Sequence, residues 1–101
     1  MQLYSIASGS SGNCIYVGGE EARILIDAGI SMKRIREGLM EEKFPIENLH
    51  AIFITHEHTD HICGLGPVLR KYRIPVYATK ETIEAIWEKG DMKGVSEDLF
   101  H

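Results

Sequence analysis

The seven residues Thr55-His56-Glu57-His58-Thr59-Asp60-His61 constrain this chain more than any other stretch. Three imidazoles and a carboxylate lie within positions 56–61, directly after the apolar run 51–54. The β-branched and aromatic residues of that run predict a buried strand. In α/β folds, ligands bind beyond the carboxyl ends of the strands. The stretch therefore predicts a ligand site at the end of a central strand.

The side chains of this stretch are metal ligands by type. Imidazole nitrogen suits zinc, iron, nickel and copper, whereas carboxylate oxygen suits harder ions such as manganese. His56 and His58 are two positions apart, so they point the same way in an extended segment. Glu57 and Thr59 then point away from them.

Asp60 and His61 follow at the turn, where they can face a second ion beside the first. Two adjacent metals can hold a bridging hydroxide and clamp both oxygens of a displacement. Two simpler interpretations stay open. The histidines could be ordinary surface residues, or they could belong to one structural zinc, which usually has four closed ligands that include cysteines.

This run resembles the His-x-His-x-Asp-His motif of the metallo-β-lactamase superfamily, and Thr55 precedes it at the end of the apolar strand. The resemblance implies that His56 and His58 bind one metal ion. It implies that Asp60 and His61 bind the other.

Two upstream segments extend the resemblance to the YycJ/WalJ branch of the superfamily. They are the Ser/Gly loop, residues 8–13, with the pattern Ser-Gly-Ser-x-Gly-Asn, and residues 25–29, Leu-Ile-Asp-Ala-Gly. The resemblance implies that the loop borders the active-site cleft and that Asp27 supports the site from behind, orienting a ligand histidine. From the residues alone, residues 8–13 could be a plain turn or a loop that cradles a phosphate. Asp27 could simply be a turn residue that caps its own backbone.

Apolar runs bounded by turn residues predict the strands. We expect strands at residues 2–8, 14–17, 22–26, 51–54 and 74–78. In the first we expect Leu3, Ile6 and Ala7 in the core. Gly18-Gly19 predicts a hairpin in which glycine supplies the positive φ of a tight turn.

Helical periodicity and capping residues predict the helices. The first helix begins after Ser31 and buries Met32, Ile35 and Leu39. The second covers residues 65–72. The third follows Thr79, ends at Gly90 and directs Ile83, Ile86 and Trp87 toward the core. Residues 91–101 show little periodicity, and no partners can be assigned to Met92, Val95, Leu99 and Phe100.

The composition excludes several classes of protein. The 101 residues are 44% hydrophobic and 26% charged, which is typical of one globular domain. There is no apolar run of 18 residues, so no membrane span is expected, and the first residues do not resemble a secretory signal. The two cysteines, Cys14 and Cys63, form no disulfide framework. We therefore expect a cytoplasmic location. Cys63 lies two residues from His61 and could be a metal neighbour, but we expect a packed or inert thiol, since free cysteines are often buried.

The resemblance implies an α/β fold (α+β in some schemes): the N-terminal half of an αββα sandwich, with a mixed, mainly antiparallel sheet and flanking helices. Residues 1–101 would form the N-terminal part of the domain. The later His, Asp and His ligands of the superfamily would belong to a C-terminal half that this chain lacks, and His101 matches no later motif. Such a half leaves an apolar sheet face exposed, which predicts self-association.

The implied function is that of a metal-dependent hydrolase with two divalent ions. Zinc fits the imidazoles, and manganese or iron fits a carboxylate-rich site. A bridging hydroxide, oriented by Asp60, would attack a phosphodiester, as in a nuclease acting on DNA ends. The net charge of −4 gives DNA binding no support, and Arg70, Lys71 and Arg73 are the only basic cluster near the motif. Thioester or lactam hydrolysis, and a non-catalytic metal-binding or interaction fragment, are the alternatives.

Overall fold

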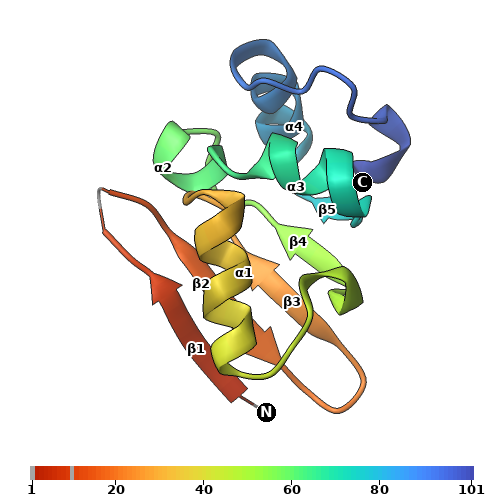
Figure 1. Cartoon of the computed structure of the whole chain (residues 1–101). Coiled ribbons are helices and arrows are strands. Elements are labelled where there is room, and N and C mark those ends of the chain that lie inside the picture. The colour runs from red at the N-terminus through yellow and green to blue at the C-terminus, as the bar shows by residue number, and fades with distance from the viewer. Residues whose placement is uncertain (1, 10) are drawn as a thin grey trace.

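The protein is built around a mixed five-stranded sheet (Figure 1). The structure is a computed structural model, and it describes residues 2–9 and 11–101. Its strands lie in chain order: β1 (Gln2–Ala7), β2 (Cys14–Gly18), β3 (Arg23–Ile26), β4 (Ala51–Phe53) and β5 (Val76–Tyr77). The helices are α1 (Met32–Glu41), α2 (Thr59–Ile62), α3 (Leu65–Tyr72) and α4 (Lys80–Lys89), with short 3₁₀ helices η1 (Ile46–Asn48) and η2 (Glu97–Leu99).

The strand directions place the motif at one edge of the sheet. β1, β2 and β3 pair antiparallel, whereas β3, β4 and β5 pair parallel. Parallel strands need a crossover between them, and the segments with α1 and with α2 and α3 supply the two crossovers. The carboxyl ends of β3 and β4 therefore meet at the same edge. The predicted mixed sheet with flanking helices is confirmed, with antiparallel and parallel pairings in equal number.

The β2–β3 hairpin forms where the sequence predicts it, but by another turn. The turn spans residues 19–22 and is closed by a 2.8 Å hydrogen bond from the Gly19 N–H to the Ala22 carbonyl. Gly18 still belongs to β2, paired with Arg23, and neither Gly18 nor Gly19 has a positive φ. The expectation of a primed glycine turn was wrong, because the loop is long enough to reverse the chain with ordinary φ values.

One face of the sheet forms the core. Tyr16, Leu25, Ile52 and Val76 lie side by side in one row across four strands, each at most 2% exposed. Helix α1 crosses this face (Figure 1) and buries Ile35 and Leu39, as its periodicity predicts, whereas the third predicted residue, Met32, is only partly buried against the core. The row and the helix together contribute five of the largest fully buried side chains: Leu25, Ile35, Leu39, Ile52 and Val76.

The other face of the sheet is apolar and open. The next row is Ile15, Ile26, Phe53 and Tyr77, where Phe53 is 42% and Tyr77 40% exposed. Their rings stack with centroids 5.2 Å apart. The strand predicted at residues 51–54 is present, but Phe53 was wrongly expected to be buried, because alternation along the strand turns it to this open face.

Leu3 was also wrongly assigned to the core. It is 70% exposed, whereas Tyr4 and Ile6 pack against the core cluster. Alternation along β1 explains the difference, because residues 4 and 6 share the face toward α1 and residue 3 lies on the opposite one.

The helices begin at the predicted caps. The Ser31 hydroxyl accepts from the Arg34 N–H at 3.3 Å, and the Thr79 hydroxyl accepts from the Thr82 N–H at 3.1 Å. Gly90 ends α4 as predicted. Within the described residues, no helix has both the length and the apolar character needed to cross a bilayer.

The C-terminal segment packs although its sequence shows no periodicity. Met92, Val95 and Leu99 are at most 9% exposed. Phe100 forms a parallel bridge with Val76 and packs its ring against Trp87 at 5.3 Å. The segment thus continues the sheet beyond β5, through contacts that local sequence patterns cannot reveal.

Two leucines test the assignment of the two faces. We expect Leu25→Ala to lower the free energy of unfolding by about 2–5 kcal/mol, because it leaves a cavity in the core. Leu3→Ala should change it by less than about 0.5 kcal/mol, because the side chain is exposed. Urea unfolding followed by circular dichroism measures both. Equal losses in the two variants would contradict this assignment.

Candidate metal centre

Asp27 is the buried charge at the edge where β3 and β4 end. It follows β3 directly and is 5% exposed. Its φ of 67° lies in the left-handed region, which few residues other than glycine adopt. A 2.7 Å hydrogen bond from the Asp27 N–H to the Phe53 carbonyl holds this conformation and turns the side chain toward the end of β4.

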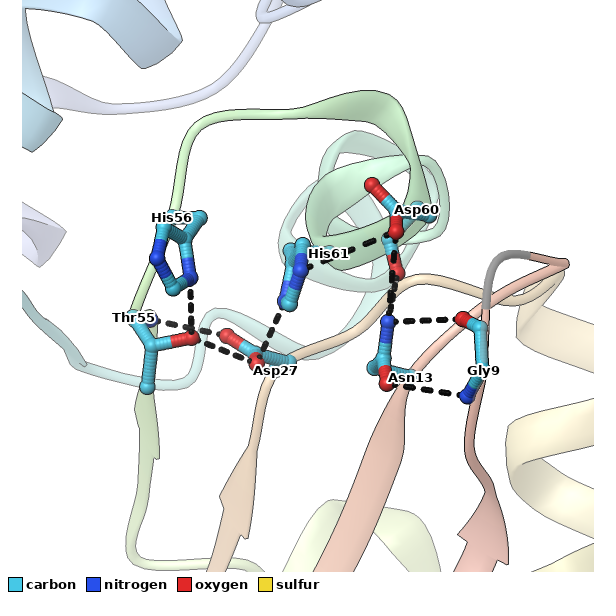
Figure 2. A network of polar contacts seen from close by, with 7 residues as sticks. All are labelled: Gly9, Asn13, Asp27, Thr55, His56, Asp60 and His61. Atoms are coloured by element: carbon cyan, nitrogen blue, oxygen red, sulfur yellow. Dashed lines mark hydrogen bonds and ion pairs between the residues drawn. The ribbon is translucent and has the colours of Figure 1, made fainter.

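The Asp27 carboxylate accepts three hydrogen bonds (Figure 2). Oδ1 accepts from the Thr55 N–H at 2.8 Å, and Oδ2 accepts from the Thr55 hydroxyl and from His61 Nδ1, each at 2.7 Å. An ionised carboxylate can only accept, so the proton of the His61 ring lies on Nδ1. In the neutral ring, Nε2 then carries the free lone pair that a metal ligand needs.

His56 is oriented by the same carboxylate through Thr55. The Thr55 hydroxyl gives its proton to Asp27, so its oxygen accepts from His56 Nδ1, 3.1 Å away. The neutral His56 ring therefore also presents Nε2 as its free nitrogen. Asp27 thus fixes the tautomers of two histidines, one directly and one through a hydroxyl (Figure 2).

The four predicted metal residues lie together at this edge. The His56 ring centroid is 4.8 Å from that of His61 and 6.0 Å from that of His58. Asp60 Oδ2 is 3.7 Å from His61 Nε2. Asp60 and His61 lie in α2, and His58 precedes its first residue.

The donor set fits divalent ions, although the side chains are not closed around one position. Among residues 2–9 and 11–101, no three His, Cys, Asp or Glu side chains converge tightly enough to form a finished site. Three imidazoles and one carboxylate are nevertheless donors that zinc, manganese and iron accept. The free Nε2 atoms of His56 and His61, the His58 ring and the Asp60 carboxylate are the groups that would bind.

Close backbone contacts fix α2 beside Asp27. The Ala28 N–H donates to the His61 carbonyl, and the Gly64 N–H donates to the Ala28 carbonyl, both at 2.8 Å. A Cβ on Gly29 would lie 1.8 Å from the Asp60 carbonyl oxygen. Only glycine allows this approach, which explains the glycine of the Leu-Ile-Asp-Ala-Gly segment.

A cavity of about 540 Å³ opens beside His58. Its wall includes Glu57, Ile62, Arg70 and Lys89. The Glu57 carboxylate accepts from its own backbone N–H, which lowers its pKa, and the charges of His58 and Lys89 act in the same direction. Glu57 and His58 both border this cavity. Alternation along an extended segment had predicted that their side chains point in opposite directions.

Of the predicted basic cluster, only Arg70 reaches this cavity. Its guanidinium donates to the Asp91 and Lys93 carbonyls at 3.1 and 2.9 Å, so it holds the segment after α4 in place. Lys89 was missed by sequence analysis, because only the packing of α4 brings it to this wall.

The two cysteines differ in their surroundings. Cys14 is buried in the core, and desolvation raises the pKa of its thiol to about 12. Cys63 is exposed beside the cavity, which corrects the expectation of a packed thiol. It follows the short helix α2, and partial desolvation raises its pKa, against a smaller lowering by Arg34.

Comparisons with known proteins identify the family of this chain. The sequence profile of the metallo-beta-lactamase superfamily matches residues 7–100. Over 81 residues the chain is 46% identical to exodeoxyribonuclease YycJ of Bacillus anthracis, and over 84 residues 49% identical to exodeoxyribonuclease WalJ of Streptococcus pneumoniae. These alignments cover 80% and 82% of this chain but only 31% of either relative.

A solved structure supports the same fold. Rm3 metallo-beta-lactamase superposes with a TM-score of 0.71 at 26% identity, over 83% of this chain and 32% of that protein. The predicted fold and the predicted resemblance to the YycJ/WalJ branch are therefore confirmed. Because the profile matches nearly the whole sequence, this chain belongs to the metallo-beta-lactamase superfamily.

Proposed function

We propose that this chain carries the first metal-binding segment of a metal-dependent phosphodiesterase that acts on DNA. The observation that carries the proposal is the arrangement at the end of β4, where one buried carboxylate orients two histidines. Asp27 holds a proton on His61 Nδ1 and, through Thr55, on His56 Nδ1. Such an arrangement leaves both Nε2 atoms ready for metal ions.

The proposed ligand residues are those of the sequence motif. His56 and His58 would hold one divalent ion, and Asp60 and His61 the other, with zinc the best match to the imidazoles. Bound ions of this kind supply Lewis acidity and an activated water for hydrolysis. Asp60 lies where it can also orient the attacking water, whereas Asp27 acts only by orienting the histidines.

Further ligands from a C-terminal half of the domain are part of the proposal. The chain's coverage of only 31% of its curated relatives supports it.

DNA as the substrate is supported by the two relatives described as exodeoxyribonucleases. The cavity beside His58 has the size of a small-ligand site, so it can accommodate the nucleotide next to the scissile phosphate. Lys89 on its wall supplies a positive charge in a chain of net charge −4. We also propose a cytoplasmic location, which the two free thiols support.

Metal binding can be tested on the chain itself. We expect His58→Ala to weaken zinc binding at least tenfold in isothermal titration calorimetry, because it removes one ligand of the first ion. His50→Ala is the matched control: His50 precedes β4, at the opposite end of the strand from the motif. Equal zinc binding in the two variants would exclude His58 as a ligand.

Hydrolysis should be tested on the protein that carries this chain, with end-labelled double-stranded DNA. We expect nucleotide release that requires a divalent ion, stops with a chelator and falls at least a hundredfold in His58→Ala, since the ion supplies most of the catalysis. His50→Ala should retain activity. A thioester and a β-lactam serve as comparison substrates. Faster turnover of either one than of DNA would overturn the choice of substrate.

A second candidate function is that of a self-associating module, and the open sheet face favours it. Phe53 and Tyr77 form an exposed aromatic pair, and the half-exposed Ile15 and Ile26 extend it across the sheet. Contiguous apolar surfaces of this kind mark interaction sites. A second copy of the chain could cover this face with its own.

Sedimentation velocity distinguishes this candidate. We expect the chain to form dimers with rising concentration and Phe53→Lys to remain monomeric, because a charge on the open face opposes burial. Met40→Lys is the control, since Met40 is 59% exposed on α1, away from this face. A monomeric wild-type chain at every concentration, or a Phe53→Lys dimer, would rule out association through this face.

A further inference from the structure

Asn13 connects the Ser/Gly loop, residues 8–13, to the metal motif (Figure 2). Its side-chain Nδ2 donates to the Gly9 carbonyl at 3.0 Å, and its Oδ1 accepts from the Gly9 N–H at 3.2 Å. The same Nδ2 donates to the Asp60 carbonyl at 3.1 Å and approaches Asp60 Oδ2 at 3.4 Å. One amide group therefore spans the two segments.

The backbone of Asn13 makes the same connection. Its N–H donates to the Asp60 carbonyl, and its carbonyl accepts from the Gly29 N–H, both at 2.8 Å. The Asp60 carbonyl thus receives two hydrogen bonds from one residue, 47 positions away in the chain. These backbone bonds do not depend on the side chain, so they should hold the two segments together when the side chain is changed.

The side chain acts on the Asp60 carboxylate itself. Oδ2 lies between Asn13 Nδ2, at 3.4 Å, and His61 Nε2, at 3.7 Å. Both Nδ2 protons already have a carbonyl acceptor, so Oδ2 shares the proton that is directed at the Asp60 carbonyl. This shared bond draws the oxygen toward the Ser/Gly loop and limits the directions of the carboxylate relative to the His61 ring. A carboxylate with a fixed direction binds an ion more tightly, because less rotational freedom is lost on binding.

We propose that Asn13 is a positioning residue for the second metal ion: it orients the Asp60 carboxylate toward the position that Asp60 and His61 share. This inference rests on the proposed function, because it assumes that both residues bind metal. It goes beyond it in giving the Ser/Gly loop a role in metal binding. The loop would act through the Asn13 side-chain amide, which contacts the proposed ligand Asp60.

Three variants separate this role from simple support of the loop. Asn13→Ala removes the amide from both Gly9 and Asp60. Gly9→Ala keeps the Asn13 amide and the backbone groups of residue 9 that it bonds, but it strains the loop: Gly9 has a φ of +114°, which strains any other residue, and an added Cβ would meet nothing within 4 Å. Asn48→Ala repeats the asparagine substitution at an exposed residue of η1.

The readout is the binding of Co²⁺ to the protein that carries this chain, followed by calorimetry and by the visible absorption of the bound ion. We expect two binding steps in the wild type. Asn13→Ala should weaken the second step about tenfold to a hundredfold, as is usual when a partner of a metal ligand is removed. The first step, at His56 and His58, should change less than about threefold. Gly9→Ala and Asn48→Ala should leave both steps unchanged.

Each outcome decides one question. Equal weakening of both steps, or the same loss in Gly9→Ala, would show that the loop matters only as support and would overturn the inference. Wild-type second-step affinity in Asn13→Ala would overturn it as well, while leaving the proposed function intact. Absence of Co²⁺ binding by the wild-type protein that carries this chain would overturn the proposed function and this inference with it. Asn13→Ser, whose shorter hydroxyl cannot span Gly9 and Asp60, replaces Asn13→Ala if the latter does not fold, and must show the same selective loss.

Discussion

The buried carboxylate of Asp27 is the interaction on which the site depends. It is a charge at 5% exposure, and its three hydrogen bonds compensate for its removal from water. Hydrogen bonds to charged groups each contribute roughly 1.5–3 kcal/mol. The Thr55 N–H and hydroxyl are two of the donors, and His61 Nδ1 is the third. The carboxylate therefore connects the end of β4 to helix α2. The orientation of the histidines therefore follows from the need to satisfy a buried charge.

Backbone proximity makes this arrangement possible. The Asp27 side chain can reach both partners only because α2 lies directly against the turn that follows β3. Gly29 permits that contact, since any side chain there would overlap the Asp60 carbonyl. The left-handed conformation of Asp27 is stabilised by its bond to Phe53 in the neighbouring strand. Strain in the turn is thus balanced by pairing across the sheet edge.

The sequence predicts those parts of the molecule that local patterns determine. The strand before the motif, the helix after Ser31 and the cap at Thr79 all follow from apolar spacing and capping chemistry, and they form as expected. The candidate ligand residues stand out in the sequence because four donors within six positions have no common structural reason to occur together.

What the sequence could not predict depends on contacts between distant segments. Leu3 and Phe53 were misplaced because an apolar residue in a strand does not reveal which face it occupies. The packing of Leu99 and Phe100 is set by β5 and α4, which lie far from them in the chain. The bond from Asn13 to Asp60 joins residues 47 positions apart. Its only local signal is the Gly-Asn pair at the end of a turn-rich loop.

The two faces of the sheet have separate consequences for function. The site lies at the edge of the sheet, and its orienting contacts come from β3, β4, α2 and the Ser/Gly loop, all within this chain. The Phe53 and Tyr77 side chains of the open face take no part in these contacts, and Phe53 contributes only its backbone carbonyl, which accepts from the Asp27 N–H. Covering that face would add stability by burying apolar surface, but it would not be needed to set the tautomers of His56 and His61. The chain can therefore orient His56 and His61 before any ligand or partner is added.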